Sequence, residues 1–189
     1  MINARVQNII DVANKFTGTD GEPCEGTEFY ILKSMWVMML SELEGSIKEL
    51  AEFYIDEVKK SEIHKINICL LLQNFYPNSE ENLTINKVIS VYKKNPKDID
   101  YRNFTRNYKP KYKSQAVEKL FNTLGIFFSE EEITSLKMLD GIASTRDSIA
   151  HGDNQIQITK KELEERLLEI KNTYNMLKNK LDSNLLMIG

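Results

Sequence analysis

The sequence is poor in the residues that build disulfide frameworks and metal clusters. It has two cysteines, Cys24 and Cys69, and two histidines, His64 and His151, among 189 residues. The cysteines do not form a CxxC pair, and no second Cys/His cluster accompanies them, which argues against a zinc site. Two unpaired thiols are typical of a cytosolic protein. We therefore expect a cytoplasmic protein that uses no metal and no other cofactor.

Long apolar runs and strand patterns are also scarce. No stretch approaches the roughly 18 apolar residues that span a bilayer. The closest, residues 31–43, contains Lys33 and Glu42. Residues 1–16 are amphipathic and lack the apolar core of a signal peptide. Residues 156–159 alternate in polarity but are too few for a convincing strand. We therefore expect neither a secretory signal nor an association with membranes.

Helical periodicity, in contrast, runs through most of the chain. It predicts helices over residues 3–16, 28–60, 63–75, 114–125, 130–152 and from 160 onward, with a weaker one at 82–94. Two capping boxes mark helix starts at Ser129 and Thr159, and Gly125 is a predicted helix stop. In the last helix, apolar residues are spaced 4-3-4-3-4, as in a helical bundle. They are Leu163, Leu167, Ile170, Tyr174, Leu177 and Leu181.

These patterns predict one all-α domain over residues 1–189, an antiparallel helical bundle with a polar, basic insertion near residues 92–113. The net charge is −3, yet the insertion has eight Lys/Arg and two Asp, a local +6 that leaves −9 for the remainder. Aromatic planes can stack on bases while cations meet phosphates. The predicted RNA-binding residues are Lys93, Lys94, Arg102, Arg106, Lys109 and Lys111. They alternate with Tyr92, Tyr101, Phe104, Tyr108 and Tyr112. The alternative is a solvated loop whose tyrosines pack on the bundle.

Two charged residues fall on apolar helix faces. On a helical projection, the apolar side chains of residues 139–150 gather within roughly 60° of Arg146. Those of residues 37–55 gather in the same way around Glu44. A buried guanidinium needs a carboxylate, a phosphate or nearby water, because it cannot lose its proton. We expect Glu44 and Arg146 to face one polar pocket. Gly45, which is costly within a helix, suggests that another helix approaches closely there.

His151 is the second feature of this region. It lies five residues after Arg146, where Gly152 and Asp153 should end the helix. Residues five apart lie about 140° apart on a regular helix, so convergence requires a loosened last turn and the reach of Arg146. A helix C-terminus favours the charged imidazolium, which suits His151 to proton transfer near neutral pH. We interpret His64, which has no such partner, as a surface or packing residue.

Residues 146–152, RDSIAHG, resemble the R-x(4–6)-H motif of HEPN domains, often written R-N-x-I-A-H-G. Residues 41–51, SELEGSIKELA, resemble the E-G-x-[VI]-K-E-L-A segment of the stand-alone bacterial HEPN subfamily labelled RiboL-PSP and MAE. With the helices around them, the likeness covers most of the chain and is diffuse over residues 61–128. One departure is Asp147, where the family commonly has Asn. An acid there would repel phosphate unless it orients Arg146 or His151.

The resemblance implies a HEPN-type bundle that dimerises with both R-x4-H motifs in one cleft and cleaves RNA without metal. Such proteins often act in toxin–antitoxin or phage-defence systems, so the expected partners are RNA, a second copy, and an antitoxin or defence protein. The implied chemistry is attack by the 2′-OH to give a 2′,3′-cyclic phosphate. In it His151 moves protons, Arg146 steadies the phosphate, and Glu44 and Asp147 orient them.

Three alternatives stay open. Arg146 and Glu44 could form a buried structural salt bridge. The chain could be a catalytically inactive HEPN module for dimerisation or RNA binding. Lastly, it could be an unrelated helical adaptor in which R-x4-H is accidental.

Overall fold

A computed structural model describes residues 2–16, 21, 25–60 and 112–188. In these ranges the chain is helical without strands, which confirms the all-α class. The helices are α1 (Ile2–Phe16), α2 (Gly26–Lys60), α6 (Ser114–Thr123), α7 (Glu130–Ala150) and α8 (Lys160–Ile188). Their bounds lie within a few residues of the predicted ones. The helices expected at 63–75 and 82–94 lie outside the described residues.

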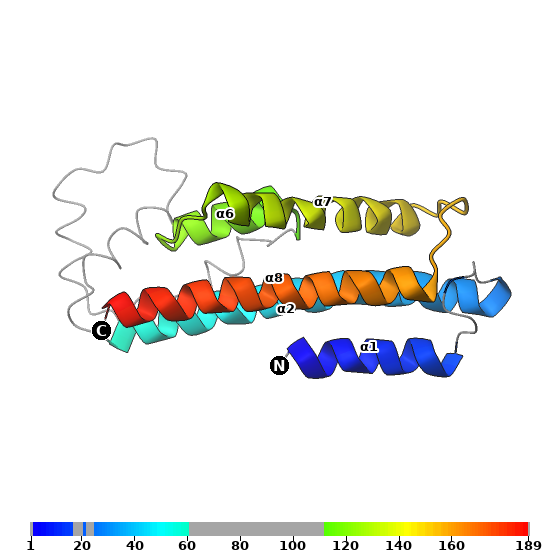
Figure 1. Ribbon diagram of the computed structural model, residues 1–189, viewed down its shortest axis with the longest axis horizontal. Coiled ribbons are helices and arrows are strands. Elements are labelled where there is room, and N and C mark those ends of the chain that lie inside the picture. The colour runs from blue at the N-terminus through cyan, green and yellow to red at the C-terminus, as the bar shows by residue number, and fades with distance from the viewer. Residues whose placement is uncertain (1, 17–20, 22–24, 61–111, 189) are drawn as a thin grey trace.

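Helices α2 and α8 form the central pair of the bundle, with α1 on one side and α6 and α7 on the other (Figure 1). Lys33, near the start of α2, donates to the carbonyl oxygen of Asp153, just before α8, at 2.7 Å. Tyr54, near the other end of α2, donates to Asn184 Oδ1 at 2.9 Å. α2 and α8 therefore run in the same direction, while α1 and α7 are antiparallel to them (Figure 1).

The core lies where α2, α7 and α8 meet. Trp36 of α2 is buried, and its indole Nε1 donates to the carbonyl oxygen of Ile142 in α7 at 3.1 Å. This bond satisfies the one polar atom of a large apolar side chain. On α8 the predicted seam faces this core, with Tyr174 partly buried and the other five residues buried. Burial of that seam drives the docking of α8 on the bundle.

Both ends of α7 are defined by local hydrogen bonds. At its start, Ser129 and Glu132 form the predicted capping box, with Ser129 N–H donating to the Glu132 carboxylate at 2.7 Å. At its end, Gly152 has a φ of 80° and its N–H donates to Ile149 O at 3.1 Å. Asp153 N–H donates to Ser148 O at 3.0 Å, which completes a Schellman motif. His151 is therefore the C-cap residue of α7.

Two more predicted helix boundaries, at Gly125 and Thr159, are also confirmed. Gly125 follows α6 with a φ of 77°, and its N–H donates to Asn122 O at 3.0 Å. Thr159 Oγ1 accepts from the Glu162 N–H at 3.1 Å and caps α8. Both patterns are local, so the sequence alone predicts them well.

Candidate active site

Arg146 lies at the edge of the core. Its side chain is 32% exposed, because the apolar stripe of α7 ends near this point: Ile142 and Ala143 are buried, but Ala150 is exposed. The guanidinium lies over the Tyr112 ring, with 5.5 Å from Cζ to the ring centroid. Its Nη1 donates to Asp147 Oδ1 at 3.3 Å. The guanidinium is thus held between an aromatic face and a carboxylate, and part of it stays open to solvent.

Asp147 is the shared hydrogen-bond acceptor of the charged and polar side chains around Arg146. Lys113 Nζ lies 3.4 Å from Asp147 Oδ2, and the Tyr112 hydroxyl donates to Asp147 Oδ1 at 3.4 Å. Loss of hydration disfavours the carboxylate, but the hydrogen bonds from Lys113 and Arg146 outweigh this and lower the pKa of Asp147. We call Glu44, Tyr112, Lys113, Arg146 and Asp147 the Arg146 cluster.

The start of α6 brings Tyr112 and Lys113 to this cluster. Lys113 is the N-cap residue of α6 but gives no side-chain cap. Instead, Asp140 of α7 accepts from the Ser114 N–H at 2.9 Å and from the Ser114 hydroxyl at 2.6 Å. A carboxylate at a helix N-terminus accepts from N–H groups that have no partner within the helix, and its negative charge interacts favourably with the positive end of the helix dipole. Sequence reasoning missed Asp140; its spacing of two turns from Asp147 on α7 was the available signal.

Glu44 lies close enough to Arg146 for the two charges to interact. Burial raises the pKa of Glu44, and the positive charge of Arg146 partly offsets that rise. Glu44 also contributes to the raised pKa of Tyr112, whose largest cause is burial. Among the described residues, however, the ion pair of Arg146 is with Asp147 and not with Glu44. The alternative of a Glu44–Arg146 salt bridge is therefore not what these residues form.

The explanation expected for Gly45 is wrong within the described part of the chain. A Cβ at Gly45 would have one described non-neighbouring atom within 4 Å, Arg5 Nη1 at 3.7 Å, and no helix backbone. Arg5 of α1 crosses α2 here and bonds Glu42 at 3.0 Å and Glu49 at 2.9 Å. The Arg5 side chain, and not the backbone of a second helix, thus passes over Gly45.

His151 lies exposed at the C-cap of α7. The loosened last turn expected there is absent, because the His151 N–H still donates to Asp147 O at 3.0 Å. Within the described residues the imidazole makes no bond to Arg146. The following turn is held by Lys33, which is only 8% exposed and lies over the Phe29 ring at 4.0 Å while it bonds Asp153 O. A cation inside the apolar run of residues 31–43 was the signal for this anchor.

The predicted RNA-binding residues up to Lys111 lie outside the described residues. The end of the basic insertion is described, and Tyr112 and Lys113 place it against Arg146. In the described ranges, no group of three or more His, Cys, Asp or Glu side chains could hold a metal. No described helix is long and apolar enough to cross a membrane.

An all-α bundle with an R-x4-H motif at the end of a core helix is typical of HEPN proteins. The family model RiboL-PSP-HEPN matches residues 2–183, so the chain belongs to this family of the HEPN superfamily. Membership indicates a role in RNA cleavage or RNA binding. Comparison with the curated proteins and with the solved structures finds no match.

Proposed function

We propose that the protein is a metal-independent endoribonuclease in which Arg146 and His151 carry out the chemistry. His151 takes the proton from the RNA 2′-OH or gives one to the leaving 5′-oxygen. The 2′-oxygen attacks phosphorus and the P–O5′ bond breaks, which leaves a 2′,3′-cyclic phosphate and a 5′-hydroxyl. Arg146 offers forked donors to the phosphate oxygens as negative charge develops on them.

The observation that carries this proposal is the gathering of two cations on Asp147, one helical turn before an exposed imidazole. Arg146 and Lys113 converge on Asp147, and His151 ends the same helix one turn later. Arg146 is 32% exposed, so a phosphate has access to the guanidinium. An RNA phosphodiester can replace Asp147 as the shared acceptor, because it offers Arg146 and Lys113 one negative charge on two oxygens, as the carboxylate does. Tyr112, which lies against Arg146, is next to the last residue of the basic insertion, along which RNA would arrive.

A homodimer would complete the site. From Tyr30 to Ser41, every exposed position of α2 is uncharged, although 28% of the chain is charged. Tyr30 is 66% exposed and Met38 is 46% exposed. This face, defined by residues 30, 34, 38 and 41, ends one turn before Glu44. The charge of Arg146 acts on Glu44. Pairing two copies there buries apolar surface beside the Arg146 cluster and gives the His151 of each copy access to a shared cleft.

Cleavage assays with defined variants test the proposal. Purified protein is incubated with single-stranded and structured RNA in EDTA, beside Arg146→Ala, His151→Ala and the histidine control His64→Ala. We expect the wild type and His64→Ala to cleave RNA and to leave DNA intact. We expect the two site variants to lose about 100-fold or more, in line with lost acid–base or electrostatic help. Equal cleavage by all four proteins, or by none, contradicts the proposal.

One observation favours a second candidate, an RNA-binding HEPN module without catalysis. Asp147 forms ion pairs with both Arg146 and Lys113, whereas the related motif commonly has Asn at this position. In that case the wild type binds RNA and Arg146→Ala weakens the binding, but no cyclic phosphate forms. A toxin or defence role adds a cellular readout: expression arrests growth, and His151→Ala relieves the arrest.

A further inference from the structure

A cleft of about 790 Å³ opens between α8 and the connection from α6 to α7, at the opposite end of α7 from the Arg146 cluster. Glu132, at the start of α7, lines it and lies fourteen residues before Arg146, roughly 21 Å along the helix. The cleft is therefore separate from the proposed catalytic site.

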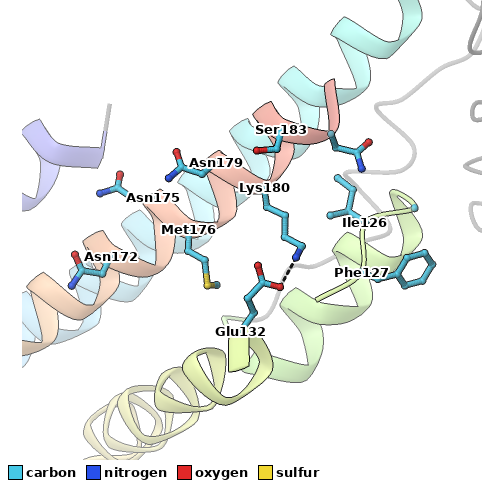
Figure 2. Close-up of a pocket in the computed structure, with 11 residues that line it drawn as sticks. Ile126, Phe127, Glu132, Asn172, Asn175, Met176, Asn179, Lys180 and Ser183 are labelled. Atoms are coloured by element: carbon cyan, nitrogen blue, oxygen red, sulfur yellow. Dashed lines mark hydrogen bonds and ion pairs between the residues drawn. The ribbon is translucent and has the colours of Figure 1, made fainter. Parts of the chain in front are cut away.

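Asparagines line one side of this cleft. Asn172, Asn175 and Asn179 project from one side of α8, and Met176 and Lys180 project from the side nearer α7 (Figure 2). These three asparagines are exposed, whereas Asn184, which also lines the cleft, is half-buried and accepts from the Tyr54 hydroxyl. Exposed helix positions usually hold Lys, Glu or Arg, which favour the helix more than Asn does. A row of neutral carboxamides is thus unfavourable for α8 itself, and it suggests recognition of something outside the helix.

The spacing of these side chains fits an extended polypeptide. Asn175, Asn179 and Ser183 are four residues apart, so they follow one another at about 6.0 Å along the helix axis. Two residues of an extended chain span about 6.6 Å, and two of a polyproline II chain about 6.2 Å. A carboxamide has one acceptor and one N–H₂ donor group, so it can pair with both polar groups of a peptide unit. Successive side chains on α8 can therefore meet alternate residues of a bound chain.

The charge of the cleft favours a peptide over RNA. Of the eleven lining residues, the charged ones are Glu132 and Lys180, and they pair with each other (Figure 2). Burial opposes ionisation of Glu132, yet hydrogen bonds from Lys180 and Ser129 outweigh it and lower the pKa of Glu132. With its one cation occupied, the cleft offers little to phosphates. Its opposite wall is apolar: Ile126 is buried and Phe127 is 71% exposed.

We infer that this cleft binds an extended, uncharged polypeptide segment of a partner protein. Asn175 and Asn179 hydrogen-bond its main chain at alternate residues, and an apolar side chain of the segment packs on Phe127 and Met176. This mode needs no charge on the partner, and it leaves the Arg146 cluster open. It is independent of whether the protein cleaves RNA.

Peptide selection tests this inference. A displayed library of random twelve-residue peptides is selected on the full chain, and affinities are measured by fluorescence anisotropy. The tested variant is Asn175→Ala with Asn179→Ala, and the control is Asn154→Ala in the exposed α7–α8 connection. Alanine favours the helix, so the double variant keeps α8 folded, which a thermal melt verifies. A mixed-sequence single-stranded RNA of similar length is the second probe.

We expect selected peptides to bind the wild type and the control equally and to lose at least about fivefold for the double variant. N-methylation along the peptide should weaken binding at every second position. The inference is overturned if no peptide is enriched, or if the double variant binds the enriched peptides like the wild type. Loss of RNA binding without loss of peptide binding also overturns it and makes the cleft an RNA surface.

Discussion

At the scale of single residues, Asp147 controls how much positive charge the site presents. Its carboxylate accepts from Arg146, Lys113 and Tyr112 and neutralises one of the two cations. It also keeps the guanidinium in place when no phosphate is bound. In the proposed function, Asp147 therefore has two opposite effects: it orders the Arg146 cluster, and it competes with the RNA phosphate for the two cations.

Replacing Asp147 with Asn should separate these effects. We expect Asp147→Asn to bind RNA more tightly, with the salt dependence of log K steeper by about 0.7 for each additional phosphate that the freed cations neutralise. The pKa of Asp147 is lowered in the folded protein, so its ionised form stabilises the fold above the unfolded pKa and loses this effect on acidification. The variant should thus melt slightly lower at neutral pH and like the wild type in acid. Weaker RNA binding by the variant contradicts the assigned role.

Glu44 should have the opposite effect on stability. Because burial raises its pKa, the fold favours the protonated acid, and stability is lost as pH rises through the folded pKa. Glu44→Gln should therefore melt higher than the wild type at neutral pH, and the difference should vanish below about pH 4, near the unfolded pKa. Thermal melts across this range provide the measurement. A variant that is less stable at neutral pH would show that attraction to Arg146 exceeds the cost of burial.

The residue-scale contacts were only partly predictable from the sequence. The helical projection places Glu44 and Arg146 on apolar faces, and the structure brings them into one electrostatic environment. The projection could not show that Arg146 would form its ion pair with Asp147. That pairing depends on Tyr112 and Lys113, which come from the start of another helix. Asp140 was missed for the same reason: its partner, Ser114, is twenty-six residues away.

At the scale of elements, the end of α7 positions the R-x4-H motif. The Schellman motif at Gly152 ends the helix at Ala150, with His151 as the C-cap, and Lys33 attaches the next turn to α2. Local patterns in the sequence predicted this stop and the starts of α7 and α8. The regularity of the last turn was not predicted, because the expected convergence of Arg146 and His151 required it to loosen.

Gly152→Ala tests the importance of this helix end. Alanine at a φ of 80° is strained, and the free energy of unfolding should fall by about 1–2 kcal/mol. RNA cleavage should fall as well, since His151 precedes the strained residue. Gly141→Ala is the matched control: a Cβ there meets nothing described within 4 Å in mid-helix, and the change should stabilise α7 by up to about 1 kcal/mol. Denaturant unfolding of both variants measures the two changes in the free energy of unfolding. Equal changes would contradict the importance assigned to the helix end at Gly152.

At the scale of the whole molecule, the bundle leaves the uncharged face of α2 beside the Arg146 cluster without a described partner. Helical periodicity predicts the class and the core, because each helix shows its buried stripe in its own sequence. Neither the parallel arrangement of α2 and α8 nor the meeting of α6 with α7 is visible in that pattern. Both depend on how the helices pack with one another.

Met38→Asp should convert the proposed dimer to a monomer, since it places a charge at the centre of the uncharged face. Phe53→Asp is the control, because Phe53 is similarly exposed on α2 but lies outside that face. Sedimentation at micromolar concentration should show dimers for the wild type and the control and monomers for Met38→Asp. A monomeric wild type, or dimers of all three proteins, would contradict the proposed pairing.

The central claim is that His151 and Arg146 act on the 2′-oxygen and the phosphate of RNA. The most direct test compares an RNA oligonucleotide with the same oligonucleotide carrying 2′-deoxyribose at the cleaved position, in EDTA, with products identified by mass spectrometry. We predict a 2′,3′-cyclic phosphate and a 5′-hydroxyl from the RNA, no cut at the deoxy position, and no cut by His151→Ala. Cleavage at the deoxy position, or undiminished cleavage by His151→Ala, would contradict the account.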